Sequence, residues 1–286
     1  MASTQLDLRS QQYGNNIMLL AQRKMSKMLP FVYNKGIVTG KTFFQDRMAE
    51  WSMEAKGGLN VATPQNDPGY SRRMAYIKTY NDGRLVDRSI TLQSLANPTS
   101  EWAMNAAYAM GRKIDSEILT ALIGSAAYGE AGGSSVALPS AQKIANGSTG
   151  LTLAKILQAK RIMDEDDVEE DGRCMVVSPQ ALEDMLSVEQ LTSNDYNSVK
   201  ALVRGDVDTF LGFKFIKHTG LAVASLVRSC IAFQRNALAF GSTAGSFVKV
   251  EDLPTRSYSK QIYYELNIGA VRLEEERVVQ VDILEV

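Results

Sequence analysis

Histidine and cysteine, the residues that most often carry catalysis and metal binding, are scarce in this sequence. Its 286 residues include one histidine, His218, and two cysteines, Cys174 and Cys230. The cysteines lie far apart in strand-like runs, so we expect free, mostly buried thiols made in a reducing compartment. One histidine with two separated cysteines does not predict a zinc site. A hydrolase centred on His218 would need a nucleophile and an acid around it, and the default prediction is instead a strand-end loop after the run KFIKH.

An excess of basic charge is also missing. The 31 lysines and arginines are balanced by 32 acidic residues, which leaves a formal net charge of -1. Domains whose main task is to grip nucleic acid are usually basic, so this balance argues against that class. No apolar run approaches the length of a membrane span, and the start MASTQLDLRSQQYGNN has no apolar core of a signal peptide. We therefore expect a soluble protein made in the cytoplasm, with no membrane partner.

One segment imitates a nucleotide-binding loop without completing it. The run GIVTGKT, from Gly36 to Thr42, would place Lys41 against phosphates, but three residues separate its glycines where the motif needs four. No apolar strand ending in aspartate follows as a partner for magnesium. A glycine-rich turn before an exposed loop is the preferred interpretation, and a nucleotide-binding enzyme is kept as an alternative.

The acidic run 164–171 imitates the start of a calcium loop at Asp167, Glu169 and Asp171. The twelfth position of such a loop needs a bidentate glutamate, and here it is Ser178. A solvated helix end and turn is the better interpretation. Paired-acid catalysis is unsupported, and no other constellation of catalytic residues stands out. We therefore expect a protein that is not an enzyme and binds neither metal nor cofactor.

A long helix is the clearest predicted element. Asn97 can cap it, Pro98 suits its first position, and apolar residues recur every three to four residues until Gly124. Such a helix would have about 26 residues and a length of roughly 39 Å, which is typical of a structural spine.

The other predicted elements interleave helices and strands without a regular βαβ rhythm, which indicates an α+β fold. Strands at 74–81 and 85–92 are expected to form a hairpin at Asp82-Gly83. Residues 125–150, rich in Gly, Ala and Ser, are expected to be a loop. Further helices are predicted at 151–166, from Ser178-Pro179 onward and at 194–204, and strands at 173–178, 212–217, 229–234, 237–241, 246–251 and in the alternating tail 257–285.

Two segments near the start have no place in a compact core. Residues 1–36 have a side-chain charge of +4 and near-helical apolar spacing, so we expect a short amphipathic helix ending near Pro30. It would lie either on its own domain or, as an arm, on a neighbouring subunit. In 37–75 the apolar residues have no clean period, which favours an extended loop packed on a neighbour. These features favour assembly over catalysis.

The order of parts resembles the major capsid proteins of tailed phages, with the Hong Kong 97-type fold. The resemblance covers most of the chain and depends on four runs together. They are PTSEWAMNAAYAMGRKIDSEILTALIGSA, GLTLAKILQAKRIMDEDDVEEDGRCMVVSPQALEDML, TSNDYNSVKALVRGDVDTFLGFKFIK and SYSKQIYYELNIGAVRLEEERVVQV.

The resemblance implies a layout of domains. Residues 1–36 would be the N-terminal arm, and 37–75 the extended loop that reaches over an adjacent subunit. A peripheral domain would combine 76–130 with 246–286, and 131–245 would be the axial domain, with 188–208 pointing at the five-fold and six-fold axes. Subunit contacts would then involve Phe43, Phe44, Trp51, Asn194 and Tyr196.

The resemblance also implies partners. The chain would assemble with itself into hexamers and pentamers, inside the host cytoplasm, to form the virion head. A separate scaffolding protein, a portal protein and packaged double-stranded DNA, held without sequence-specific contact, would be the other partners. A shell of a cellular compartment, similar to an encapsulin, is the alternative within the same fold.

Overall fold

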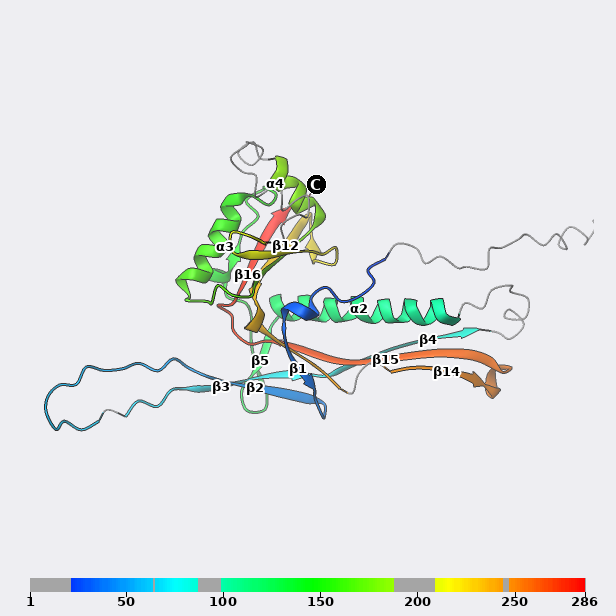
Figure 1. The fold of residues 1–286 in the computed structure, drawn as a ribbon, viewed down its shortest axis with the longest axis horizontal. Coiled ribbons are helices and arrows are strands. Elements are labelled where there is room, and N and C mark those ends of the chain that lie inside the picture. Colours follow the sequence, from blue (N-terminus) through cyan, green and yellow to red (C-terminus); the bar gives the residue numbers. More distant parts are fainter. Residues whose placement is uncertain (1–21, 64, 87–98, 188–208, 244–246, 286) are drawn as a thin grey trace, which may run out of the picture. The chain divides into compact units, whose positions relative to one another are not determined.

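The computed structural model describes residues 22–63, 65–86, 99–187, 209–243 and 247–285 (Figure 1). The chain divides into two compact units, each built from separated segments. The first unit combines Met1–Ser26, Thr79–Lys113 and Gly245–Leu266. The second combines Lys27–Lys78, Ile114–Ala244 and Asn267–Val286.

Helix α2, Thr99–Ile123, confirms the predicted spine. Buried side chains recur along the helix at spacings of three to five residues, with Ile118 and Leu119 adjacent: Ala106, Met110, Asp115, Ile118, Leu119 and Leu122. The helix ends at Gly124, where a Cβ atom would lie 2.6 Å from the carbonyl oxygen of Thr120. A side chain would therefore collide with the last turn, which explains the glycine. The predicted cap Asn97 lies outside the described residues.

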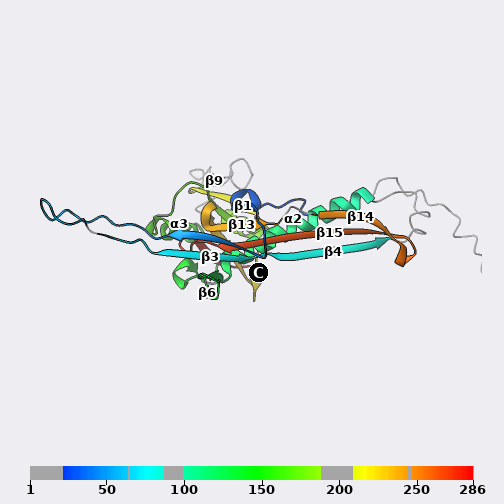
Figure 2. The same ribbon diagram turned by 90° about the horizontal axis from the view of Figure 1, so that it is seen from below.

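In the first unit, strand β15 (Ser259–Arg272) pairs through its first half with β14 (Phe247–Leu253) and with β4 (Lys78–Val86) (Figure 2). The predicted hairpin at Asp82-Gly83 is wrong, because both residues lie inside β4. The Asp82 carboxylate accepts hydrogen bonds from the Gly83 amide and the Tyr264 hydroxyl, both at 2.8 Å. Pairing with β15 thus overrides the local turn preference of the two residues.

The second unit contains a large mixed sheet in the order β7-β16-β12-β8-β10-β9. Strand β8 (Arg173–Val177) is buried at all five residues and runs parallel to β10 (Phe213–Lys217) and antiparallel to β12 (Val227–Gln234). A strand buried throughout must be covered on both faces. The remaining strands are β7 (Lys143–Ile144), β9 (Thr209–Phe210), β16 (Val278–Leu284) and the short β11 (Val223–Ala224), which pairs with β12.

The two helices that begin within the described residues of the second unit have side-chain caps. Thr152 accepts a hydrogen bond from the Lys155 amide at the start of α3 (Leu153–Glu165). The Ser178 hydroxyl accepts one from the Ala181 amide, at 3.0 Å, at the start of α4 (Pro179–Ser187). The Ser-Pro start predicted for α4 is therefore confirmed. The helix predicted at 194–204 lies outside the described residues.

Two other predictions need correction. Residues 125–150 are not only a loop, since they contain β5 (Ala126–Tyr128), β6 (Ser134–Val136), a 3-10 turn at Ser140–Gln142 and β7. Strand β5 pairs with β3 (Tyr70–Tyr76), and this tertiary pairing overrides the Gly-rich composition. The amphipathic helix predicted to end near Pro30 lies partly outside the described residues. In the described part, residues 22–28 form no helix, and only a 3-10 turn at Leu29–Phe31 includes Pro30.

Two further strands join the second half of β15. Strand β1 (Tyr33–Ile37) runs parallel to β13 (Leu238–Ser242), which is antiparallel to β15. The alternating tail therefore forms two strands, β15 and β16, separated by residues 273–277. Within the described parts of the chain, no helix is long and apolar enough to cross a membrane.

The two cysteines are free and buried, as predicted. Burial raises the pKa of Cys174 to about 11 and that of Cys230 to about 12. Since the thiolate is the reactive form, both thiols should be inert in the folded protein. We expect iodoacetamide at pH 8 to leave both unmodified in the native protein and to modify both in urea, as measured by mass spectrometry. Labelling of either cysteine at equal rates in the two states would contradict this prediction.

Candidate functional site

An antiparallel ribbon carries the most exposed apolar side chains of the second unit. Strand β2 (Thr42–Met48) pairs with β3 from Thr42↔Tyr76 to Met48↔Tyr70. Residues 49–69 continue beyond the ribbon and return to it, and their described residues, 49–63 and 65–69, have no regular structure (Figure 1, Figure 2). We call this segment the ribbon loop. Its large apolar side chains lie in solvent, at exposed fractions of 64% for Trp51, 99% for Met53 and 93% for Leu59. Clustered apolar exposure of this kind marks an interaction surface.

The two faces of the ribbon differ. On one face, Phe43 and Ala75 join a core cluster with Ala126, Ala239, Val271 and Leu273. On the other face, the Arg72 guanidinium lies 5.3 Å from the Phe44 ring centroid and pairs with Asp46, with Nη2 and Oδ2 3.1 Å apart. This hydrogen-bonded pair lowers the pKa of Asp46. One face therefore fixes the ribbon to its own chain, whereas on the other face Arg72 and Asp46 stay partly exposed and Met74 is buried.

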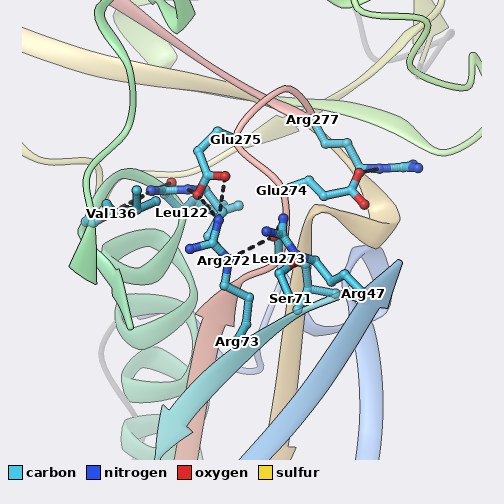
Figure 3. Close-up of polar contacts among 11 residues, drawn as sticks. Arg47, Ser71, Arg73, Leu122, Val136, Arg272, Leu273, Glu274, Glu275 and Arg277 are labelled. Atoms are coloured by element: carbon cyan, nitrogen blue, oxygen red, sulfur yellow. Dashed lines mark hydrogen bonds and ion pairs between the residues drawn. The ribbon is translucent and has the colours of Figure 1, made fainter. Parts of the chain in front are cut away.

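A buried ionic cluster holds the base of the ribbon (Figure 3). Arg73 Nη2 lies 2.7 Å and 2.6 Å from the two oxygens of Glu275, and its Nε donates to the Leu273 carbonyl at 3.2 Å. From β2, Arg47 also donates to that carbonyl. Both strands of the ribbon thus bind the turn 273–277, which connects β15 with β16.

Arg272 extends the same cluster to the end of helix α2. Its Nη1 donates to the carbonyls of Leu122 at 2.9 Å and Gly124 at 2.5 Å, and its Nη2 donates to that of Val136 at 3.0 Å. The last carbonyls of a helix have no partners within the helix and carry partial negative charge. The fully buried Arg272 side chain therefore caps the spine helix with a cation.

One carboxylate serves both cations of this cluster. Arg272 Nε lies 3.4 Å from the Glu275 oxygen that Arg73 also binds. Burial lowers the pKa of both guanidiniums, and the negative charge of Glu275 opposes that shift. Glu275 therefore compensates two buried charges and joins the ribbon, the 273–277 turn and the end of α2. We call Arg73, Arg272 and Glu275 the anchor.

The sequence-predicted contact residues fall in different environments. Phe43 is buried in the core of its own chain. Phe44 is half-buried beside Arg72, and Trp51 lies exposed in the ribbon loop. Asn194 and Tyr196 lie outside the described residues. Whether these side chains form subunit contacts stays a prediction.

The sequence did not reveal the anchor. Arg73 directly precedes the predicted strand 74–81, Arg272 and Glu275 lie in the predicted tail 257–285, and none belongs to a recognisable motif. The one available signal was a charged residue within an otherwise apolar run, as Arg272 is in IGAVRL. Buried charges of this kind are retained only with partners.

The segment from Gly36 to Thr42, which partly matches a phosphate-binding loop, does not have the structural surroundings of such a loop. Gly36 belongs to β1, and Thr42 begins β2, so the segment connects two strands. A nucleotide-binding loop of this type needs a helix directly after it, whose amide groups bind the phosphates. The segment is the glycine-rich turn that the sequence favoured, with Gly36 and Gly40 at positive φ.

The acidic run forms the end of α3 and the turn after it, as expected. Glu169 points to Arg277, with its carboxylate 2.9 Å from Nη1, and this pairing lowers the pKa of Glu169. Gln234 donates to the Glu169 carboxylate and to the Asp171 carbonyl, both at 3.1 Å. These contacts connect the turn to β12 and to the residues before β16.

His218 directly follows β10, which confirms the predicted strand-end position. It is buried, its Nε2 lies 3.1 Å from Asp115 Oδ2, and its Nδ1 accepts a hydrogen bond from the Gly220 amide at 3.0 Å. Asp115, fully buried on α2, also accepts from the backbone amides of Lys27 and Met28, both at 3.1 Å. Asp115 therefore joins residues 27–28 and the end of β10 to the spine helix.

Comparison with protein families gives one match across nearly the whole chain. A family described as phage capsid protein matches residues 5–285. No match was found among curated proteins.

Several solved phage capsids have a similar fold. A capsid of the cyanophage P-SCSP1u has a TM-score of 0.75 at 13% identity and covers 98% of this chain and 94% of its own. The capsid of Ralstonia phage GP4 has a TM-score of 0.74 at 11% identity. The match covers 98% of this chain and 96% of the GP4 chain. An acid-stable capsid of the Helicobacter pylori bacteriophage KHP30 has a TM-score of 0.74 at 8% identity. The match covers 99% of this chain and 97% of the KHP30 chain. The predicted α+β fold of the Hong Kong 97 type is therefore confirmed.

Proposed function

The chain belongs to the phage capsid protein family, and on this premise we propose how it builds a shell. It is a major capsid protein, a structural component of the virion that assembles with copies of itself. In the proposed layout, 1–36 is the arm and 37–75 the extended loop. The peripheral domain is 76–130 with 246–286, and the axial domain is 131–245, with Asn194 and Tyr196 near the symmetry axes.

The observation that carries the proposal is the ribbon loop on its anchored base. Its exposed apolar side chains cannot be covered by a structureless segment alone, and a neighbouring subunit would bury them. Burying one tryptophan removes about 150–250 Å² from water, or roughly 4–6 kcal/mol at ~25 cal/mol per Å² before ordering costs. Each contact is repeated in every subunit, so modest contacts add up to a stable shell.

The proposal extends to other partners and to the absence of catalysis. A separate scaffolding protein would guide assembly in the host cytoplasm, and a portal protein would occupy one vertex. The near-zero net charge would let packaged double-stranded DNA move without tight phosphate contacts. The chain would act as a structural protein and not as an enzyme, because the one nucleotide-loop candidate joins two strands.

Electron microscopy of the purified protein tests the proposal directly. We expect closed shells, or hexamer and pentamer rings, under assembly conditions. A stable monomer under all conditions would rule out the proposed self-assembly. Copurified DNA and portal would support a virus, whereas a copurified enzyme cargo would support a cellular compartment.

The role of the ribbon loop is tested by Trp51→Ala. We expect the critical concentration for assembly to rise about tenfold or more, since large aromatic anchors dominate interface energies. Light scattering over a concentration series measures it. Gln65→Ala is the matched control, because Gln65 is an exposed polar residue of the same loop. Equal critical concentrations for the two variants would contradict the proposed contact.

A further inference from the structure

A groove lies in the first unit, between helix α2 and the strands β4 and β15. Its volume is about 250 Å³. The helix contributes Trp102, Ala106 and Ala109, and β15 contributes Ile262, which is buried. The groove lining is therefore partly apolar, with the polar Asn105 beside these residues, and the volume suits one large side chain.

Two guanidinium groups border this groove. Arg84 lies over the Trp102 ring, with Cζ 5.4 Å from the ring centroid. Arg112 Nη1 donates to Gln22 Oε1 at 2.7 Å and to the Arg23 carbonyl at 3.3 Å, which hold it in place. In the described parts of the chain, no ion pair of Arg84 or Arg112 is formed.

The carboxylate at the groove is already engaged. Asp82 accepts hydrogen bonds from the Tyr264 hydroxyl and the Gly83 amide. These hydrogen bonds lower the pKa of Asp82, so it stays charged, and the two arginines still leave the groove lining with a net positive charge. An occupant that fits these features is an apolar or aromatic side chain flanked by negative charge.

The ribbon loop contains such a segment, Glu50-Trp51-Ser52-Met53-Glu54. Trp51 and both glutamates are exposed. Glu50, Glu54 and Asp67 against Lys56 give residues 49–69 a net charge of -2. The described residues of the first unit have the opposite sign, with eight basic and five acidic side chains.

We infer that this groove receives Trp51 from the ribbon loop of a second copy, with Glu50 and Glu54 against Arg84 and Arg112. The inference rests on the proposed shell function and names the surface that its loop contacts. A loop of one copy on a different surface of the next is a heterologous contact. Such contacts generate rings when the rotation closes, which is the geometry that hexamers and pentamers need.

Site-specific photo-crosslinking tests the inference. A benzophenone amino acid replaces Trp51, and assembled shells are irradiated, digested and analysed by mass spectrometry. We expect crosslinked dimers with attachment in residues 79–86, 99–113 or 259–266. Crosslinks from intact shells to other regions, or within one chain, would overturn the groove assignment and leave the shell function standing. Failure of the wild-type protein to form shells would instead overturn the proposed function.

Charge reversal gives an independent measurement. We expect Arg84→Glu to slow assembly about tenfold or more, because like charges would face each other across the interface. The loop variant Glu50→Arg with Glu54→Arg should slow it similarly, and the combined triple variant should recover much of the wild-type rate. Lys260→Glu is the matched control, since Lys260 is exposed on β15 outside the groove.

Circular dichroism of each variant separates an interface effect from misfolding. Equal slowing by Lys260→Glu and Arg84→Glu, or no recovery in the folded triple variant, would overturn the inference.

Discussion

Replacing Glu275 with alanine is expected to lower the free energy of unfolding by about 3–5 kcal/mol. The change leaves Arg73 and Arg272 buried with no carboxylate between them. Water cannot replace the lost charge without opening the site. The expected loss therefore exceeds that of an exposed salt bridge, which is about 0–1 kcal/mol.

Urea unfolding of the unassembled subunit measures this effect. Glu276→Ala is the matched control, because Glu276 is the adjacent, exposed glutamate. Glu275→Gln keeps an acceptor oxygen without the charge and should fall between the two variants. If Glu275→Ala were no less stable than Glu276→Ala, the anchor would not hold the base of the ribbon.

Replacing Asp115 with alanine is expected to cost about 3 kcal/mol or more. Three donors lose their acceptor at once: the amides of Lys27 and Met28 and the Nε2 of His218. A buried donor without a partner costs roughly 1–3 kcal/mol, so the sum depends on how far residues 27–28 move toward water.

Urea unfolding and limited trypsin digestion distinguish global from local loss. We expect Asp115→Ala to lower stability and to speed cleavage at Lys27, while Asp115→Asn, which retains an acceptor oxygen, recovers part of both. Ser116→Ala is the control, because Ser116 is exposed on the same helix. Unchanged cleavage at Lys27 in a destabilised Asp115→Ala variant would show that Asp115 does not hold that segment.

The sequence predicted elements whose signal is local. Helix α2 was evident because its apolar residues repeat over a long distance, and α4 because Ser178-Pro179 is a strong start. The central strand β8 was evident as a short apolar run. In these cases the residues that define an element are neighbours in the sequence.

The errors arose where distant residues decide the structure. Asp82-Gly83 has the composition of a turn, but its neighbours are residues of β15, including Tyr264. Strand β5 forms because β3 lies beside it, although two of its three residues are alanines and the segment around it is rich in small residues. The anchor joins Arg73 to Glu275, which lie 202 positions apart. No periodic pattern connects such positions, so single-sequence reasoning could not find them.

The exposed ribbon loop also affects how unassembled subunits associate. Before it meets a partner, each newly made chain displays Trp51, Met53 and Leu59 to the surrounding solution. Any other apolar surface can bind them, so errors of association grow with the concentration of free chains. A high concentration of free subunits therefore favours incorrect association. The yield of correct particles should be highest when subunits are supplied slowly and are incorporated promptly into growing shells.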